Sequence, residues 1–177
     1  KVAEIYARHL RSTPEAILYG KGFNQDTVNA TINTPQALAP TAVPLLDCLD
    51  VEQFRSIASG GYPMSEKLIF VGEELECGER TSSVKVNDKA MEGAIAEGEI
   101  AIIDPDKPYA AGDVVAALAP GFDGLILRKY RVRAISDEGK PKFDLAAINP
   151  DYPSVLDAHA SPDVQIIGRV IGALRKF

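Results

Sequence analysis

The spacing of hydrophobic residues changes along the chain, and this change predicts where helices give way to strands. Within residues 1–11, apolar side chains recur every four positions at Val2, Tyr6 and Leu10, as on one face of an amphipathic helix. From Val43 onward, short β-branched and aliphatic runs are separated by turn signals, which is typical of strands. We therefore predict a mainly β domain of roughly 130 residues, with strands at 68–71, 84–86, 99–104, 113–119, 125–135, 143–148 and 164–174.

Capping and turn residues divide the chain further. Residues 13–15, Thr-Pro-Glu, provide an N-cap, a proline and an acid for the first turn of a second short helix, and Gly20 suits its end. Residues 21–42 have no sustained period and are rich in Asn, Thr and Pro, so they predict a linker. The β domain then occupies 43–177, and residues 137–139, Asp-Glu-Gly, predict a hairpin turn within it.

The charge and the cysteine content narrow the classes of function. The formal net charge of −6 and the pI near 5.0 argue against a phosphate-binding surface, so DNA binding would need a basic module elsewhere. Cys48, Cys77, His9 and His159 form no metal or disulfide pattern, so we expect no cofactor and thiols in a reducing compartment. No apolar run approaches the roughly 18 residues that span a bilayer, and no signal peptide opens the chain. We therefore expect a cytoplasmic protein with no membrane partner.

Four phrases of the β region occur in a fixed order. Residues 84–91 form a strand phrase that ends in Asp-Lys-Ala-Met, and residues 111–115 read x-G-D-x-V. Residues 147–153 read x-x-N-P-x-Y-P, and residues 167–171 read x-G-x-V-I. Together they resemble the C-terminal domain of the self-cleaving repressors, LexA and the phage CI repressors, in which the first phrase ends in Gly-Asp-Ser-Met. The resemblance covers about 43–177 and implies a LexA-like β domain.

A second, shorter resemblance lies ahead of the linker. Residues 11–20 read RSTPEAILYG, and phage-repressor helix-turn-helix domains often end in a phrase like V-S-P-E-W-L-L-x-G. The resemblance implies that residues 1–20 are the C-terminal end of a truncated helix-turn-helix domain. The recognition helix, which would contact operator DNA, would then lie upstream of Lys1.

The family chemistry requires a serine nucleophile and a lysine that loses its proton to become the base. The serine position corresponds to Ala90, which carries only a methyl group, and the lysine position, in a strand phrase like T-F-K-K-L, corresponds to Arg128. A guanidinium with a pKa above roughly 12 cannot act as the general base. Strand alternation points the neighbouring Lys129 to the opposite face. An alternative is that Arg128 and Lys129 are simply strand residues facing solvent.

The cleavage site of the family also has a counterpart here. The scissile Ala-Gly pair follows a V-P phrase at a fixed distance, which leads from residues 43–44 to Val51-Glu52, or to Asp50-Val51 with a slip of one residue. Neither pair is Ala-Gly. We therefore assign no catalytic residue and expect that the protein is not an enzyme.

These features predict a prophage-type transcriptional repressor that is not cleaved and that forms a homodimer through its C-terminal domain. The last strand is apolar on both faces, so as an unpaired edge it would pair with its symmetry mate, through Ile166, Gly168, Val170, Gly172 and Leu174. Such a repressor would need an antirepressor protein to release it from DNA. Two alternatives stay open: a self-cleaving serine autopeptidase trapped by a Ser→Ala substitution at position 90, and a β-rich interaction module unrelated to transcription.

Overall fold

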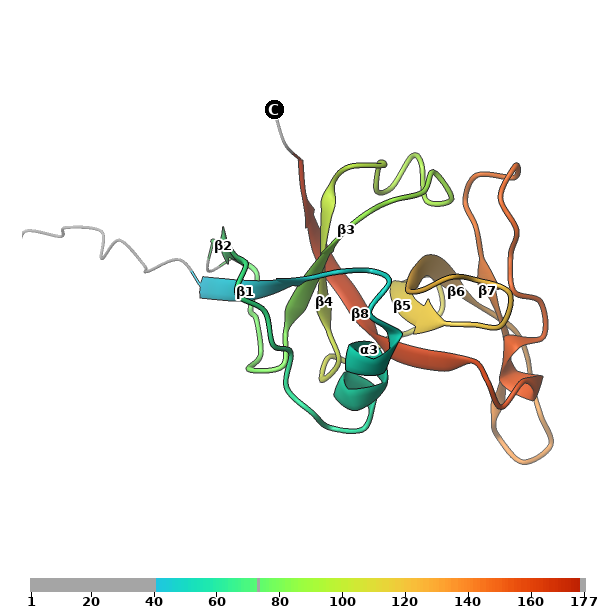
Figure 1. The fold of residues 1–177 in the computed structure, drawn as a ribbon. Helices are drawn as coiled ribbons and strands as arrows, with labels where there is room; N and C mark the ends of the chain where they lie inside the picture. The colour runs from blue at the N-terminus through green and yellow to red at the C-terminus, as the bar shows by residue number, and fades with distance from the viewer. Residues whose placement is uncertain (1–40, 73, 176–177) are drawn as a thin grey trace, which may run out of the picture. The chain divides into compact units, whose positions relative to one another are not determined.

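The computed structural model describes residues 41–72 and 74–175, which lie within the compact unit Leu38–Phe177, as an eight-stranded sheet with a short α-helix (Figure 1). The strands follow the order β2-β1-β3-β4-β8-β5-β6-β7 across the sheet. The elements along the chain are β1 (Thr41–Leu46), α3 (Val51–Ala58), β2 (Leu68–Val71), β3 (Ser82–Lys85), β4 (Ile100–Asp104), β5 (Val114–Leu118), β6 (Ile126–Ile135), β7 (Pro141–Ala146), the 3-10 helix η2 (Ala158–Ala160) and β8 (Gln165–Leu174). The prediction of a mainly β domain is confirmed.

All seven predicted strands are present, because runs of β-branched and aliphatic residues favour the extended backbone wherever a sheet can bury them. The largest displacements are two residues, at β3 and at β7, which was predicted at 143–148 and is found at Pro141–Ala146. The predicted turn at 137–139 joins β6 to β7, and the Ser136 amide donates a hydrogen bond of 2.8 Å to the Lys140 carbonyl across it.

Three of the described elements were not predicted from the sequence: β1, α3 and η2. In α3, the Asp50 side chain caps the helix by accepting a hydrogen bond of 3.1 Å from the Gln53 amide, and Phe54 and Ile57 are fully buried one turn apart. The helix has only eight residues, which is too short to show a repeated hydrophobic period. The two helices predicted within 1–20 and the linker predicted over 21–42 lie outside the described residues, except that Thr41 and Ala42 belong to β1.

The prediction that the last strand is an unpaired edge is wrong. Strand β8 lies between β4 and β5, and the edges of the sheet are β2 and β7. The two pairings are staggered: residues 165–169 of β8 pair with β5, and residues 169–174 pair with β4. A strand at the end of the sequence can enter the middle of a sheet, because sheet position depends on long-range pairing and not on chain order.

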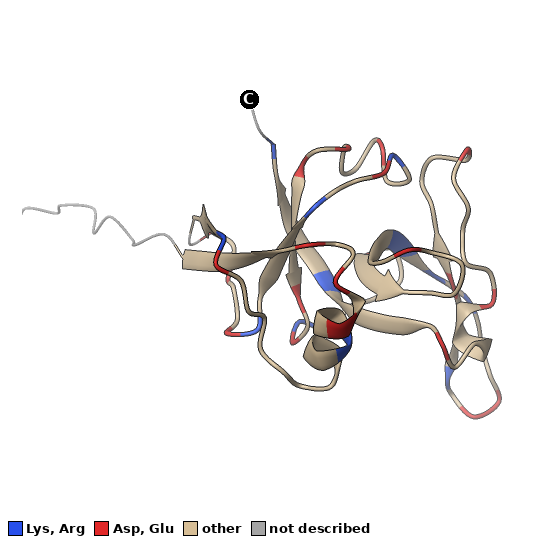
Figure 2. Cartoon of the chain, in the orientation of Figure 1, with Lys and Arg blue, Asp and Glu red and all other residues tan. Residues whose placement is uncertain are grey.

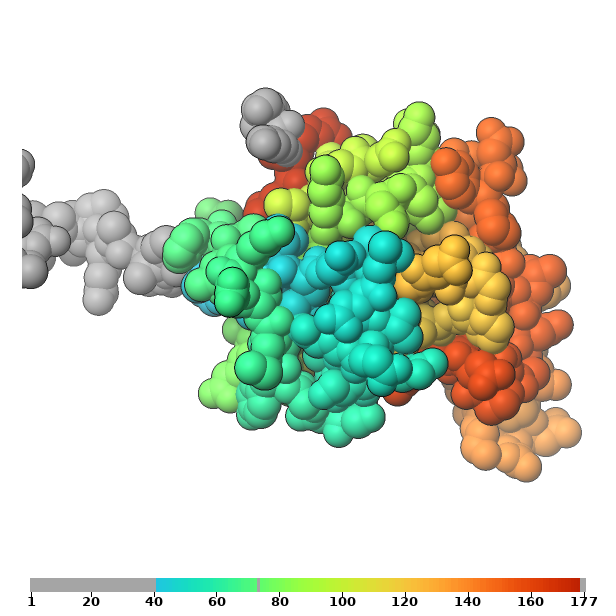
Figure 3. All heavy atoms as spheres, in the orientation of Figure 1, coloured from blue at the N-terminus to red at the C-terminus, as the bar shows by residue number. Residues whose placement is uncertain are grey.

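The main core lies between α3 and the centre of the sheet. Phe54 and Ile57 of α3 pack with Val84, Ile103 and Ile167 in one buried cluster, which places the helix against β8. In the space-filling view, the cyan and teal segment that includes α3 covers the centre of the visible face (Figure 3). The helix therefore covers one side of the sheet at the neighbouring strands β3, β4 and β8.

Candidate functional site

The structure brings together three segments: the two that the resemblance aligns with the catalytic pair, and the loop that carries the N-P-x-Y-P phrase. The first is the turn at residues 88–91, the second is Arg128 on β6, and the third is the loop at residues 148–153 that follows β7. The buried Ala90 ties the first to the third, because its carbonyl accepts hydrogen bonds from the amides of Ile148 (2.8 Å) and Asn149 (2.9 Å). The position aligned with the serine is therefore a fixed part of the packed interior.

Arg128 is one of the most deeply buried side chains in the domain, with a relative exposure of 1%. Its Nη1 lies 3.3 Å from Oδ2 of Asp88, its Nε donates to the Pro153 carbonyl (3.2 Å), and its Nη1 also donates to the Leu127 carbonyl (2.7 Å). The Phe122 ring lies under the guanidinium, with the centroid 5.3 Å from Cζ. We call Asp88, Arg128 and Pro153 the arginine clamp, because these contacts hold all three segments together.

The same carboxylate connects the two positions that the resemblance assigned to the catalytic pair. Oδ1 of Asp88 accepts a hydrogen bond of 3.2 Å from the Ala90 amide, and Oδ2 faces Arg128. Burial lowers the pKa of Arg128, and the charge and hydrogen bond of Asp88 oppose that shift. An arginine in such a pair stays protonated near neutral pH and donates hydrogen bonds, but it does not accept a proton.

The alternative that both Arg128 and Lys129 face solvent is wrong for Arg128. The period of the strand places Lys129 on the opposite face, where it is exposed, as the sequence predicted. The burial of Arg128 could not be predicted from its neighbours in the sequence, because its partners Asp88 and Pro153 lie 40 and 25 residues away along the chain.

The predicted cleavage region lies at the start of α3. Asp50 is the N-cap, and Val51 and Glu52 are the first two helical residues. Just before them, the Cys48 carbonyl accepts a hydrogen bond of 2.8 Å from the Leu125 amide, and Asn87 Nδ2 lies 3.1 Å from Cys48 Sγ. The region is thus anchored beside the 88–91 turn, but its backbone is helical and not extended.

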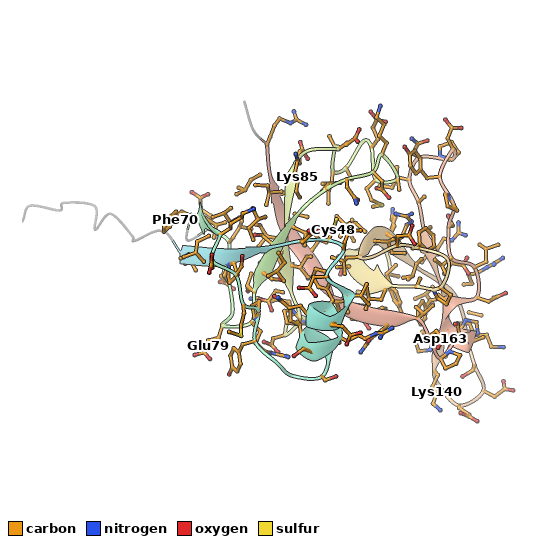
Figure 4. All side chains as sticks on the ribbon, in the orientation of Figure 1. Cys48, Phe70, Glu79, Lys85, Lys140 and Asp163 are labelled. Carbon is orange, nitrogen blue, oxygen red and sulfur yellow. The ribbon has the colours of Figure 1, made fainter. Side chains whose placement is uncertain are left out.

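A hollow of about 520 Å³ lies between the ends of β1 and β3, next to the same turn. Its lining includes the labelled side chains of Cys48 and Lys85, near the centre of Figure 4. The full lining is Leu45, Leu46, Asp47, Cys48, Lys67, Lys85, Val86, Asn87, Glu97 and Gly98. Among the described residues, no cluster of His, Cys, Asp or Glu is arranged to hold a metal ion.

The five positions predicted for the dimer interface already make contacts within the chain. Val170 packs against the cluster around α3, Ile166 against a second cluster on β5–β7, and Leu174 against a third between β1 and β4. Gly168 lies against the backbone of Asp104 and Pro105, and Gly172 lies against the Leu75 side chain. The structure therefore does not gather these five residues on one free surface.

Charges are interspersed over the domain, as Figure 2 shows. Two arginines of β6 pair with the buried carboxylate of Asp144, which lies 2.8 Å from Arg131 and 3.4 Å from Arg133. Burial would raise the pKa of Asp144, but hydrogen bonds from Arg131 and the Asp157 amide, together with Arg133, lower it. Both arginines therefore form ion pairs within the domain.

A comparison with protein families agrees with this arrangement. A family model described as Peptidase S24-like matches residues 50–171, which is more than half of the chain and contains α3, the 88–91 turn, Arg128 and the 148–153 loop. Among the residues that the structure describes, no helix is long and apolar enough to cross a membrane. The chain belongs to the Peptidase S24-like family, which includes the C-terminal domains of LexA and the phage CI repressors.

Proposed function

We propose that this chain is a prophage-type transcriptional repressor that does not cleave itself and whose S24-like domain joins two protomers. The observation that carries the proposal is the arginine clamp. At the position where self-cleavage would need a neutral amine, Arg128 is buried, paired with Asp88 and hydrogen-bonded to two carbonyl groups. The side chain supports the fold there and offers no base.

Two further observations support the absence of self-cleavage. The buried methyl group of Ala90 has no hydroxyl that could attack a carbonyl carbon. The bonds near Asp50, Val51 and Glu52 enter a capped helix, where the Asp50 carbonyl accepts a hydrogen bond of 3.3 Å from the Phe54 amide, so the backbone there is turned and not extended. Nucleophile, base and substrate conformation are thus all unfavourable for the family reaction.

The chain is expected to stay intact during prolonged incubation at about pH 10, the condition that deprotonates a lysine base. The variant Ala90→Ser is also expected to remain uncleaved, because Arg128 still cannot accept the serine proton. Intact-mass spectrometry of both proteins, sampled over days, measures the result. Fragments that end between Asp50 and Glu52 in the unaltered chain would contradict the proposal.

The second candidate function, a self-cleaving repressor trapped by a Ser→Ala substitution, is favoured by the retained site geometry. Ala90 still lies in the turn beside the Arg128 strand, with Met91 fully buried behind it. The Ala90→Ser variant separates the candidates, because rapid self-cleavage in this single variant would establish the trap. Its matched control is Ala90→Val, which adds bulk at the same fully buried position but carries no hydroxyl.

We propose that the homodimer uses the second half of β8. Residues 170–174 pair with β4 on one side, and pairing with β5 ends at Arg169, so no described strand occupies their other side. Pairing of two such segments would join two protomers, and a second DNA-binding domain would then reach the other half of a palindromic operator. Linking the half-sites in this way stabilises operator binding because the second contact becomes intramolecular.

We also propose that an antirepressor protein, and not self-cleavage, releases the repressor. In cells that carry the repressor and an operator-controlled reporter, DNA-damaging treatment alone is expected to leave the repressor intact and the reporter silent. Coexpression of the antirepressor is expected to raise reporter expression at least tenfold, since a ligand shifts an equilibrium by its differential affinity. Immunoblotting reports the integrity of the chain in the same cells. Reporter expression after damage without any second protein would contradict this mode of release.

A further inference from the structure

The outer edge of β2 is apolar, whereas charged residues are interspersed over the other described elements. Leu68 is 51% exposed and Phe70 is 65% exposed, and both project from the side of β2 that faces away from the core. Val71 is buried and Ile69 packs against the cluster around Val43. Phe70 stands at the margin of the domain in Figure 4. Four consecutive apolar residues therefore form an edge with one buried face and one exposed face.

The other edge of the sheet is protected in the ways expected of natural edge strands. Strand β7 begins with Pro141 and Lys142, which disfavour pairing with another strand. A bridge between Leu145 and Val155 then places another segment of the chain along its outer side. Strand β2 has neither a proline nor a charge, and no described strand pairs with its outer side. This contrast points to a use for the β2 edge.

The register with β1 shows which backbone groups of β2 are free. The Leu45 amide donates a hydrogen bond of 2.8 Å to the Lys67 carbonyl, so the backbone groups of residue 67 face β1. In an antiparallel ladder this orientation alternates, and residues 69 and 71 face β1 as well. The amide and carbonyl groups of Leu68 and Phe70 therefore point outward, at the same residues whose side chains are exposed.

We propose that this edge pairs with β2 of a second copy of the chain, antiparallel and about a two-fold axis beside Ile69. In this register Leu68 lies opposite Phe70 of the second copy, and Phe70 lies opposite Leu68 of the second copy. Both pairs exchange the outward backbone hydrogen bonds, and both place an aromatic ring next to an aliphatic side chain on the exposed face. Ile69 meets its own copy on the buried face. The four-residue edge is self-complementary in both its backbone and its side chains.

Charge also favours a second copy in the antiparallel direction. Strand β2 is uncharged, as the tan colour of this strand in Figure 2 shows, with Glu66 and Lys67 just before it and Glu74 in the turn after it. Antiparallel pairing about Ile69 places Lys67 opposite the uncharged Val71 of the second copy, whereas parallel pairing in the same register would place the two Lys67 side chains opposite each other. The contact is separate from the 170–174 segment of β8, so the two interfaces together would assemble dimers into a larger species.

The first test is sedimentation velocity of the full chain over a range of concentrations, for the unaltered protein and for Phe70→Lys. A lysine on an exposed edge opposes strand pairing without entering the core, so the association constant of the larger species is expected to fall at least about tenfold. The matched control is Ile135→Lys, an equally exposed aliphatic residue (62%) on β6. Circular dichroism confirms that both variants fold.

The second test uses Ile69→Cys. At a non-hydrogen-bonded antiparallel pair the two Cα atoms are about 4.5 Å apart, which suits a disulfide. Mild oxidation is expected to link two chains at position 69, as identified by peptide mapping, and Ile135→Cys is expected to give no such link through position 135. Equal association of Phe70→Lys and the unaltered chain, or no crosslink at position 69, would overturn the proposal. If Phe70→Lys is a monomer, the β2 contact is supported and the β8 dimer is contradicted.

Discussion

Replacement of Arg128 by alanine is expected to lower the free energy of unfolding by about 3 kcal/mol, because it removes one partner of a buried charge pair and several charged hydrogen bonds. The carbonyls of Pro153 and Leu127 would lose their donor, and the turn at 88–91 would lose its link to β6. This loss of unfolding free energy is at the lower end of the range for breaking a buried ion pair, because the Asp88 side chain is 28% exposed and water can hydrate it. Urea denaturation followed by circular dichroism measures the change.

The adjacent residue provides the control for this prediction. Lys129 is exposed on the same strand, and Lys129→Ala is expected to change the free energy of unfolding by less than about 0.5 kcal/mol. A difference between the two variants then reports burial and pairing and not the loss of one positive charge. If Arg128→Ala were as stable as Lys129→Ala, the arginine clamp would have no structural role, and the main support for the proposed function would be lost.

Substitution of Gly168 by alanine is expected to destabilise the domain by about 3 kcal/mol, through forced overlap with backbone atoms. A Cβ at this position would lie 2.7 Å from the Asp104 carbonyl oxygen and 2.8 Å from the Pro105 Cα. Neither atom can rotate away, so β8 would have to move relative to the end of β4. The unfolding midpoint in urea measures this effect.

Gly172 on the same strand is the matched control. A Cβ there would come within 2.8 Å of Cδ2 of Leu75, the end of a flexible side chain that can change rotamer. Gly172→Ala is therefore expected to cost about 1 kcal/mol or less. Repeating both measurements over a tenfold range of protein concentration separates packing within one chain from packing between chains, because only the latter depends on concentration. An effect of Gly168→Ala that vanished on dilution would restore Gly168 to the dimer interface.

Under the proposed function, the arginine clamp holds the site region of an S24-like scaffold in place at the positions that the resemblance aligns with the catalytic pair. The scaffold still brings the 88–91 turn, β6 and the 148–153 loop together, and Asp88 still faces the residue on β6. A buried lysine could lose its proton there, whereas a buried arginine keeps its charge and needs an acidic partner. The exchange of lysine for arginine at such a position thus favours structural support over proton transfer.

The sequence by itself determined where the strands lie and supplied the resemblance that aligns two residues with the catalytic positions of the family. Runs of β-branched and aliphatic residues placed all seven predicted strands within two residues of where they lie, because extended structure at this scale depends on local composition. The first of the four phrases aligned Ala90 with the serine position of the family, a separate strand phrase aligned Arg128 with the lysine position, and the period of β6 placed Lys129 on the exposed face. Each of these inferences uses only neighbouring residues or their order.

Only the tertiary structure decided which segments meet. The last strand was expected at an edge, but it lies between β4 and β5, because strand order depends on pairing between distant segments. Arg128 is buried because Asp88 and Pro153 reach it from elsewhere in the chain, and the charge could not be placed in the core without them. Strand alternation tells which residues share a face, but burial of that face depends on what packs against it, and that is a property of the whole fold.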